Sequence, residues 1–174
     1  HPLECQGISG LRPETDTRHG QVCDHHFVEF TYGDGLKFFS QCRCKTGTWK
    51  NVSLHVHGTQ GFADLGAGRI SNRKGQIIWT YGPGEACGQQ QGVRHLVEGL
   101  RRGQMISGID EAAHSTLTAI MGRMAGYSGK LVDWDQASQC DLSLANVDRL
   151  ASFDDPPPVM PDSDGRYPSP VLAG

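Results

Sequence analysis

The first half of the chain, to about Tyr81, alternates hydrophobic and polar residues with the period of two that is typical of β-strands. His25 to Tyr32 alternates most cleanly. Lys37 to Cys44 returns after Gly33-Asp34-Gly35, which contains the Asp-Gly pair of a tight hairpin. Further strands are predicted over Leu3 to Ser9, Asn51 to His57, Phe62 to Leu65 and Gln76 to Tyr81. The pattern therefore predicts an antiparallel meander.

The second half changes to a helical period. Hydrophobic residues follow i, i+3, i+4, i+7 spacing in a first helix, which Gly103 is placed to end; its stripe is Val93, Leu96, Val97 and Leu100. A second helix is expected from a cap at Ser107 to Tyr127, with Met121 and Met124 in the core, and Asp133 is expected to cap a short helix from Trp134 to Ser138. The predicted class is α+β, an open, mainly antiparallel β-sheet with helices packed on one face.

The predicted domain covers residues 1–153, and residues 154–174 are expected to form an extended arm. This last segment contains the run Asp-Asp-Pro-Pro-Pro and three further prolines, which disfavour regular structure. The whole chain has 174 residues, a length that fits one domain of ordinary size.

Strand parity separates the side chains of the sheet into two faces. One face is apolar and is expected to receive the helices: Val28, Phe30, Tyr32, Phe38, Ser40, Cys42, Cys44, Val52, Leu54 and Val56. The other face carries many hydrogen-bonding groups: His25, Phe27, Glu29, Thr31, Phe39, Gln41, Arg43, Asn51, Ser53, His55 and His57. This polar face is either simply solvated or in contact with a ligand or partner. Its phenylalanines and histidines are unusual choices for plain exposure to water.

Composition and charge exclude several classes of partner. Lys and Arg total 16 and Asp and Glu total 19, a formal net charge of -3, so no global basic field attracts nucleic acid or anionic lipid. No apolar run approaches the ~18 residues that span a bilayer, so we expect neither nucleic acid nor a membrane as partner. The six cysteines are too sparse for a disulfide scaffold, and the closest pair, Cys42 and Cys44, is interpreted as small buried hydrophobes.

Chemical motifs are few. The pair His55-x-His57 could bind a metal with His25 as a third ligand, but a carboxylate ligand that would complete a cupin-like motif is absent after His57. The sequence has no G-x-S-x-G nucleophile elbow, no Walker A motif and no G-x-G-x-x-G fingerprint. A histidine metal site is therefore kept only as a minor alternative, and hydrolase or phosphate-binding functions are not expected.

Two long stretches resemble the C-terminal domain of Gfo/Idh/MocA-family oxidoreductases, which are named for glucose-fructose oxidoreductase, inositol dehydrogenase and a rhizopine-catabolism protein. One runs from Ala113 to Met124 and continues to Tyr127, Gly129-Lys130 and Trp134-Asp135. The other comprises Asp24-His25, Phe39 to Arg43, Asn51 to Ser53, His55 to Thr59 and Gly61. The chain departs from relatives at Gln91-Gly92-Val93, where many have Gln-Glu-His, and at Leu54, where a Glu is common.

The resemblance implies a substrate-binding and oligomerisation domain of an NAD(P)-dependent oxidoreductase acting on a sugar, cyclitol or polyol. NAD or NADP would be bound by a Rossmann domain preceding His1 in the full-length parent, together with the catalytic Lys, so no catalytic residue is assigned in this chain. The residues expected to contact substrate or a second subunit are Arg12, His25, Arg43, His55 and His57. A homo-oligomer through the polar sheet face is expected.

Two questions stay open on the sequence alone. A stand-alone sugar-binding or scaffold module without redox activity is the alternative function. The cysteines look free, which favours a reducing, cytoplasmic location, while an exported, periplasmic one stays open because a signal would precede His1.

Overall fold

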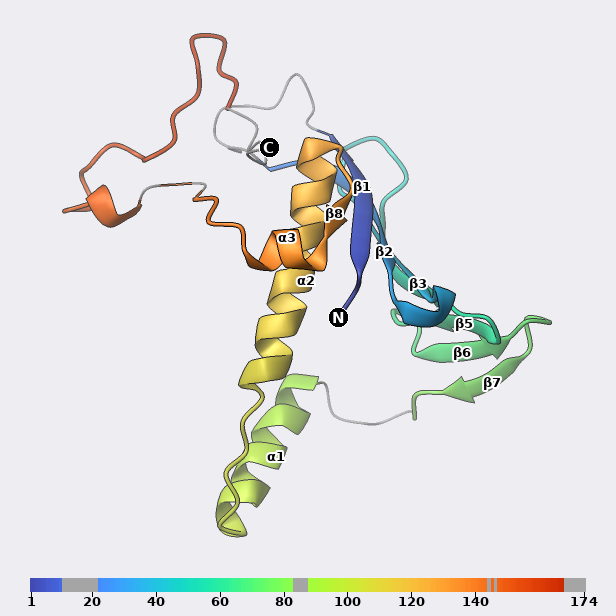
Figure 1. Cartoon of the computed structure of the whole chain (residues 1–174). Coiled ribbons are helices and arrows are strands. Elements are labelled where there is room, and N and C mark those ends of the chain that lie inside the picture. Colours follow the sequence, from blue (N-terminus) through green and yellow to red (C-terminus); the bar gives the residue numbers. More distant parts are fainter. Residues whose placement is uncertain (11–21, 83–87, 144, 146, 168–174) are drawn as a thin grey trace.

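The fold is an eight-stranded antiparallel sheet with helices beside it (Figure 1). The structure is a computed structural model, and it describes residues 1–10, 22–82, 88–143, 145 and 147–167. The strand order is β7-β6-β5-β4-β3-β2-β1-β8. The strands are β1 Glu4–Gly10, β2 His25–Thr31, β3 Lys37–Arg43, β4 Asn51–His57, β5 Gly61–Asp64, β6 Arg69–Asn72, β7 Ile77–Thr80 and β8 Val132–Asp133. The helices are α1 Gly88–Arg101, α2 Ile109–Ser128 and α3 Trp134–Ser138, with 3-10 turns at Gly33–Gly35 and Val147–Arg149. The predicted α+β class with an open antiparallel sheet is confirmed.

The central hairpin sets the register of the sheet. Asp34 and Gly35 both adopt positive φ angles, 59° and 74°, as a tight hairpin requires, and Tyr32 donates a backbone hydrogen bond to Leu36. Val28 consequently pairs with Ser40, which pairs in turn with Leu54. The strand predictions hold for β1 to β5 and for β7, whereas the sequence pattern does not predict β6 or the two-residue β8.

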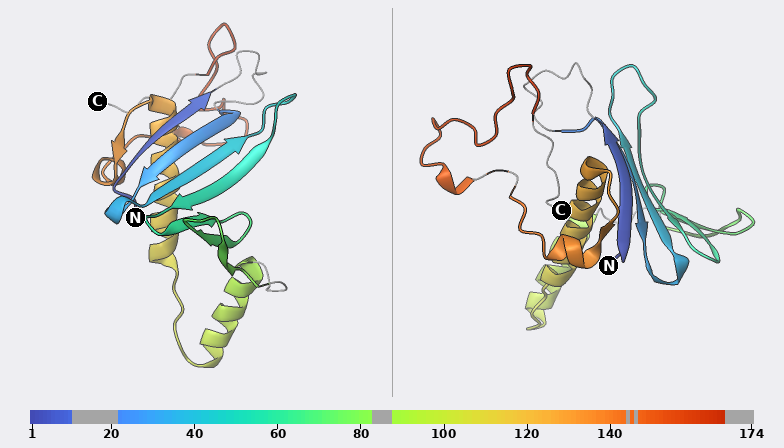
Figure 2. Two further views of the ribbon diagram at one scale, coloured as in Figure 1. Left: turned by 90° about the vertical axis from the view of Figure 1, so that its right-hand side faces the viewer. Right: turned by 45° about the horizontal axis from the view of Figure 1, so that its top comes forward.

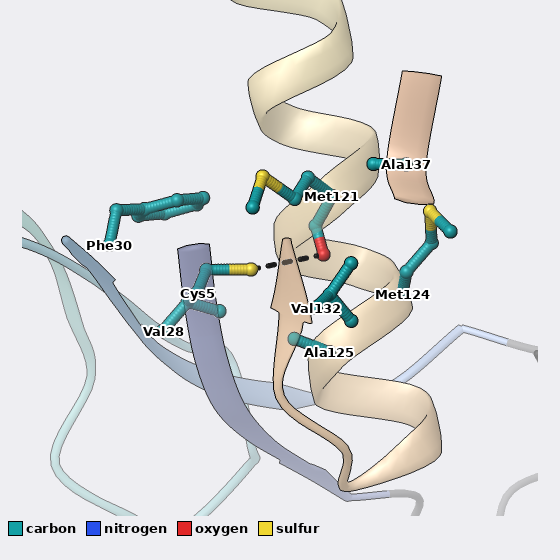
Figure 3. Packing of buried hydrophobic residues seen from close by; sticks show 8 residues of the cluster. All are labelled: Cys5, Val28, Phe30, Met121, Met124, Ala125, Val132 and Ala137. Atoms are coloured by element: carbon teal, nitrogen blue, oxygen red, sulfur yellow. Dashed lines mark hydrogen bonds between the residues drawn. The ribbon is translucent and has the colours of Figure 1, made fainter. Parts of the chain in front are cut away.

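The core lies between α2 and the strands β8, β1 and β2 at one edge of the sheet (Figure 3). It is formed by Cys5, Val28, Phe30, Met121, Met124, Ala125, Val132 and Ala137. The Cys5 thiol donates a hydrogen bond to the Met121 carbonyl, with 3.4 Å between sulfur and oxygen. Burial raises the pKa of Cys5 to about 12, so this thiol stays neutral. The expectation that Met121 and Met124 are core residues is confirmed.

Glycines allow α2 to approach the sheet closely. A Cβ added at Gly122 would lie 2.7 Å from Cζ of Phe30, and one at Gly126 would collide with the Ser9 hydroxyl. Gly7 on β1 faces the Gly126 backbone in the same way. The backbones of α2 and β1 therefore come into contact at Gly126 and Gly7, and the Phe30 side chain takes the space that a side chain at Gly122 would fill.

The helices cover less of the apolar face than the sequence predicts. α2 packs on β1 and β2, and α3 packs on α2 and β8, while β3 to β7 extend beyond them (Figure 2). Val52, on the apolar face of β4, is 74% exposed. The hydrophobic stripe of α1 is also open to solvent, with Val93 at 63% and Leu100 at 65%.

Helix ends follow the sequence in part. The Asp133 side chain accepts a hydrogen bond from the Gln136 backbone N–H at 2.7 Å, which confirms the predicted cap of α3. The predicted Ser107 cap of α2 is wrong, because the helix begins one residue later and Gly108 occupies the cap position.

Residues 150–167 form turns and bends without helix or strand. No helix in the described ranges is long and apolar enough to cross a membrane.

Candidate functional site

None of the described helices lies over the side of the sheet that faces away from α2, and we call this side the open face (Figure 2). The strand register places on it the residues that parity assigned to the polar face, together with residues of β1 and β5. They include Gln6, Ile8, His25, Phe27, Glu29, Thr31, Lys37, Phe39, Gln41, Arg43, Asn51, Ser53, His55, His57, Phe62 and Asp64.

An aromatic row crosses the open face, with one ring from each of four adjacent strands. Ring centroids are 6.1 Å apart between Phe27 and Phe39. The His57 ring lies edge-on to both Phe39 and Phe62, with centroids 4.9 Å apart in each case. Phe27 and Phe62, at the two ends of the row, are 42% and 41% exposed. The row, defined as Phe27, Phe39, His57 and Phe62, is a solvent-facing apolar strip suited to stacking on a flat partner.

Polar groups beside the row already have partners. The Lys37 ammonium donates to the Glu29 carboxylate at 2.9 Å and to the Thr31 hydroxyl at 2.8 Å. The Asn51 amide donates to the Ser53 hydroxyl at 2.8 Å. These groups can therefore be covered by a partner at a lower desolvation cost than unpaired ones.

A shallow hollow lies where β2 begins and β3 ends, away from the turn at Gly33–Gly35 that joins the two strands. Its volume is about 310 Å³, and its lining consists of the open-face residues Ile8, His25, Phe27, Gln41 and Arg43, together with His26 and Cys42, which alternate with them along the strands. The His25 ring donates from Nδ1 to the Asp24 carboxylate at 2.6 Å, which orients the imidazole. Arg43 pairs with His25 across the two strands. The hollow thus combines a guanidinium, an imidazole and an amide beside an aromatic ring, a set of groups that can bind hydroxyls.

The structure divides the predicted site residues into two groups. His25 and Arg43 line the hollow, while His55 and His57 lie next to the aromatic row or within it. Arg43 pairs with Asn51 on β4, so His25 is level with Asn51 and four residues along the sheet from His55. That offset is about 13 Å. Arg12 lies outside the described residues.

The histidine metal triad does not form, because the strand offset separates His25 from His55 and His57. Among the residues that the structure describes, no three His, Cys, Asp or Glu side chains are grouped so that they could hold a metal ion.

Two features of this region are not evident from the sequence. Phe62 completes the aromatic row, but a single sequence does not give the register of β5 against β4, so its contact with His57 cannot be derived from it. The interpretation of Cys42 and Cys44 as buried hydrophobes is wrong, because Cys42 is half-buried and Cys44 is exposed. The physical reason is that none of the described helices packs on this end of β3.

On the helix side, His26 is held in the interface between β2 and α2. Its Nδ1 lies 2.8 Å from the Ser9 hydroxyl oxygen, and its ring stacks on Tyr127 with centroids 6.3 Å apart. Burial is the main cause that lowers the pKa of His26 below 6.5, and the nearby His25 and Arg123 lower it further. The neutral imidazole is therefore the form that the fold accommodates.

This lowered pKa predicts a loss of stability in mild acid. The unfolded chain binds a proton at His26 more readily than the folded chain, so the free energy of unfolding falls as the pH drops below about 6.5 toward the folded-state pKa. In His26→Gln this contribution is absent, and urea denaturation at several pH values should show a flatter dependence. His95→Gln on the exposed helix α1 is the matched control. Equal acid sensitivity of His26→Gln and the wild type would contradict this account.

Comparison of the chain with protein-family models, with curated proteins and with solved structures gives no match. Support for a function therefore comes from the geometry of the open face and from the sequence resemblance.

Proposed function

We propose that this chain is the substrate-binding and oligomerisation domain of an NAD(P)-dependent oxidoreductase of the Gfo/Idh/MocA type, acting on a sugar, cyclitol or polyol. The observation that carries the proposal is the open face, in which the aromatic row lies beside a hollow that Arg43, His25 and Gln41 help to line. The resemblance of residues 113–135 and 24–61 to that family supplies the reaction class.

The aromatic row supports the oligomerisation part of the proposal. Stable interfaces have an apolar, aromatic centre and a polar rim whose hydrogen bonds are satisfied. The row provides such a centre, and the Lys37–Glu29 ion pair and the Asn51–Ser53 hydrogen bond lie beside it. A second copy of the same face, related by a two-fold axis, would present the same aromatic rings and the same Lys37–Glu29 ion pair to the first copy. We therefore take a second copy of this chain as the partner of the row.

The hollow supports the substrate part of the proposal. Its volume of about 310 Å³ is within the range of pockets that bind small molecules. Arg43 provides N–H groups that can donate to hydroxyl oxygens, and Nε2 of His25 can accept from a hydroxyl because its Nδ1 donates to Asp24. The Gln41 amide can donate and accept, and Phe27 offers an apolar surface to the C–H groups of a sugar ring. This combination suits a neutral polyhydroxylated ligand.

The residues present do not fit a dinucleotide. Within the described ranges, no glycine-rich turn leads from a parallel strand into a helix, the arrangement that cradles a pyrophosphate. In the proposed enzyme the nicotinamide supplies hydride chemistry from another domain. The groups of this chain bind and orient the substrate.

The proposal predicts self-association without turnover. Sedimentation equilibrium of the purified chain should show a reversible dimer or higher oligomer, and no reduction of NAD(P) should occur with sugars or polyols. A strictly monomeric chain at high concentration would contradict the oligomerisation role. Turnover by the isolated chain would contradict the assignment of hydride transfer to another domain.

The intact mass of the native polypeptide separates this proposal from a stand-alone sugar-binding module. A mass of roughly 35 kDa or more leaves room for a Rossmann domain of ~120 residues. A native mass near 18.9 kDa would favour the stand-alone module instead.

A further inference from the structure

Two cysteines lie side by side where β3 ends. The sulfur atoms of Cys42 and Cys44 are 3.7 Å apart, and the two side chains point toward one another as a thiol–thiol contact. Cys44 is exposed and follows directly after Arg43, the last residue of the strand. By contrast, Cys5 and Cys23 are buried.

We infer that Cys42 and Cys44 form a redox site, a dithiol that closes reversibly to an intrastrand disulfide by exchange with a low-molecular-weight disulfide of the glutathione class. This site goes beyond the proposed substrate and oligomer functions and does not depend on them.

The backbone geometry permits this closure. Residues two apart in an extended strand have Cα atoms about 6.4–6.8 Å apart. Disulfides span Cα separations up to about 6.8 Å, so a small bend suffices. Cys44 lies outside the regular strand, where its N–H donates a hydrogen bond to the Asp24 carbonyl at 2.9 Å. The bend therefore falls at the end of β3, at Arg43 and Cys44, and not within the strand pairs from Lys37 to Cys42.

The exchange proceeds in two balanced steps. The Cys44 thiolate attacks one sulfur of the small disulfide, the S–S bond breaks, and one small thiol leaves with a proton. Cys42 then loses its proton and attacks the Cys44 sulfur, which releases the second small thiol. Two electrons pass from the cysteines to the small disulfide. Burial and the contact with Cys44 raise the pKa of Cys42, which favours Cys44 as the first nucleophile.

Closure would also act on the hollow of the open face. Arg43 is the middle residue of the new ring, and it pairs with His25 across β2 and β3. A bend between Cys42 and Cys44 changes the backbone angles of Arg43. The oxidised and reduced chains should therefore present different geometries at the hollow.

The test equilibrates the folded chain with mixtures of reduced and oxidised glutathione, followed by acid quench, alkylation and trypsin digestion. Trypsin cuts after Lys37, Arg43 and Lys45, so a Cys42–Cys44 disulfide yields residues 38–43 joined to residues 44–45. The linked peptide should exceed the glutathione adduct at Cys44 by about ten-fold or more, because the neighbouring thiol has a high effective concentration. Added reductant should remove it.

Two variants complete the experiment. Cys42→Ser removes the resolving thiol, so the Cys44–glutathione adduct should persist. Cys140→Ser, which changes another exposed cysteine, should leave the linked peptide unchanged. The inference is overturned if Cys44 of the wild type retains glutathione as Cys42→Ser does, or if neither cysteine reacts under conditions that modify Cys140. Unchanged NMR signals of His25 on oxidation would overturn the coupling to the hollow.

Discussion

Replacing Phe27 with glutamate is expected to weaken self-association of the chain by about 100-fold or more. The ring lies at one end of the aromatic row, is 42% exposed in the single chain and is not part of the buried core, so the substitution places no carboxylate in the core. In the proposed dimer the same position is covered. A carboxylate buried there without a partner costs several kcal/mol, and about 2.7 kcal/mol already corresponds to 100-fold in the dissociation constant.

Sedimentation equilibrium of Phe27→Glu and wild type measures this effect, with circular dichroism to confirm that both chains are folded. Phe153→Glu is the matched control, since Phe153 is fully exposed and lies after the last described helical turn. It should associate like the wild type. Unchanged association of Phe27→Glu, or equal weakening by both substitutions, would show that the open face is not the interface.

Replacing Gly122 with valine is expected to lower the free energy of unfolding by about 2–3 kcal/mol. A Cβ at this position would lie 2.7 Å from Cζ of Phe30 and 3.4 Å from Cγ1 of Val28, both buried in the core. Valine adds two further methyl groups, so α2 must move away from β1 and β2. Urea denaturation followed by tryptophan fluorescence measures the loss, with Trp134 next to the core as one reporter.

Gly92→Val is the control for the intrinsic effect of valine in a helix. A Cβ at Gly92 on α1 meets no atom within 4 Å, so this substitution should change stability by no more than about 0.5 kcal/mol. Similar stabilities of the two variants would mean that α2 does not pack on the sheet as described.

The sheet is largely predictable because its determinants are local. The side-chain period of a strand is two, so the alternation in β2, β3 and β4 fixes which residues share a face. The Asp34-Gly35 turn then fixes the register of β2 against β3. Together these two features suffice to place Phe27, Phe39 and His57 on one face from the sequence alone.

The packing of the helices is less predictable, because a hydrophobic stripe does not specify its partner. The stripe of α1 is clear in the sequence, yet Val93 and Leu100 are exposed. β8 has only two residues and β6 has only one hydrophobic residue, Ile70, so neither shows a period. They form through pairing of β8 with β1 and of β6 with β5 and β7. Such pairing is a tertiary effect that local propensity does not contain.

The sequence predicts on which face of the sheet the candidate site residues lie, but it does not predict which of them lie close together. Parity places His25, His55 and His57 on the same side, but it does not give separation along the strands. The register puts His25 level with Asn51, and this offset removes the predicted metal triad. Parity also assigns Cys42 and Cys44 to the helix side without showing that α2 packs on β1 and β2 rather than on β3, which is why their interpretation as buried residues is wrong.

Hydroxyl-radical footprinting of the wild-type chain at low and at high protein concentration identifies the associating face without any substitution, because it maps which side chains become covered on association. Oxidation of Phe27, Phe39, His57 and Phe62 is expected to fall as the concentration rises, while Val93 and Leu100 of α1 react equally at both. Protection of the α1 stripe with an unchanged aromatic row would contradict the assignment of the open face as the interface.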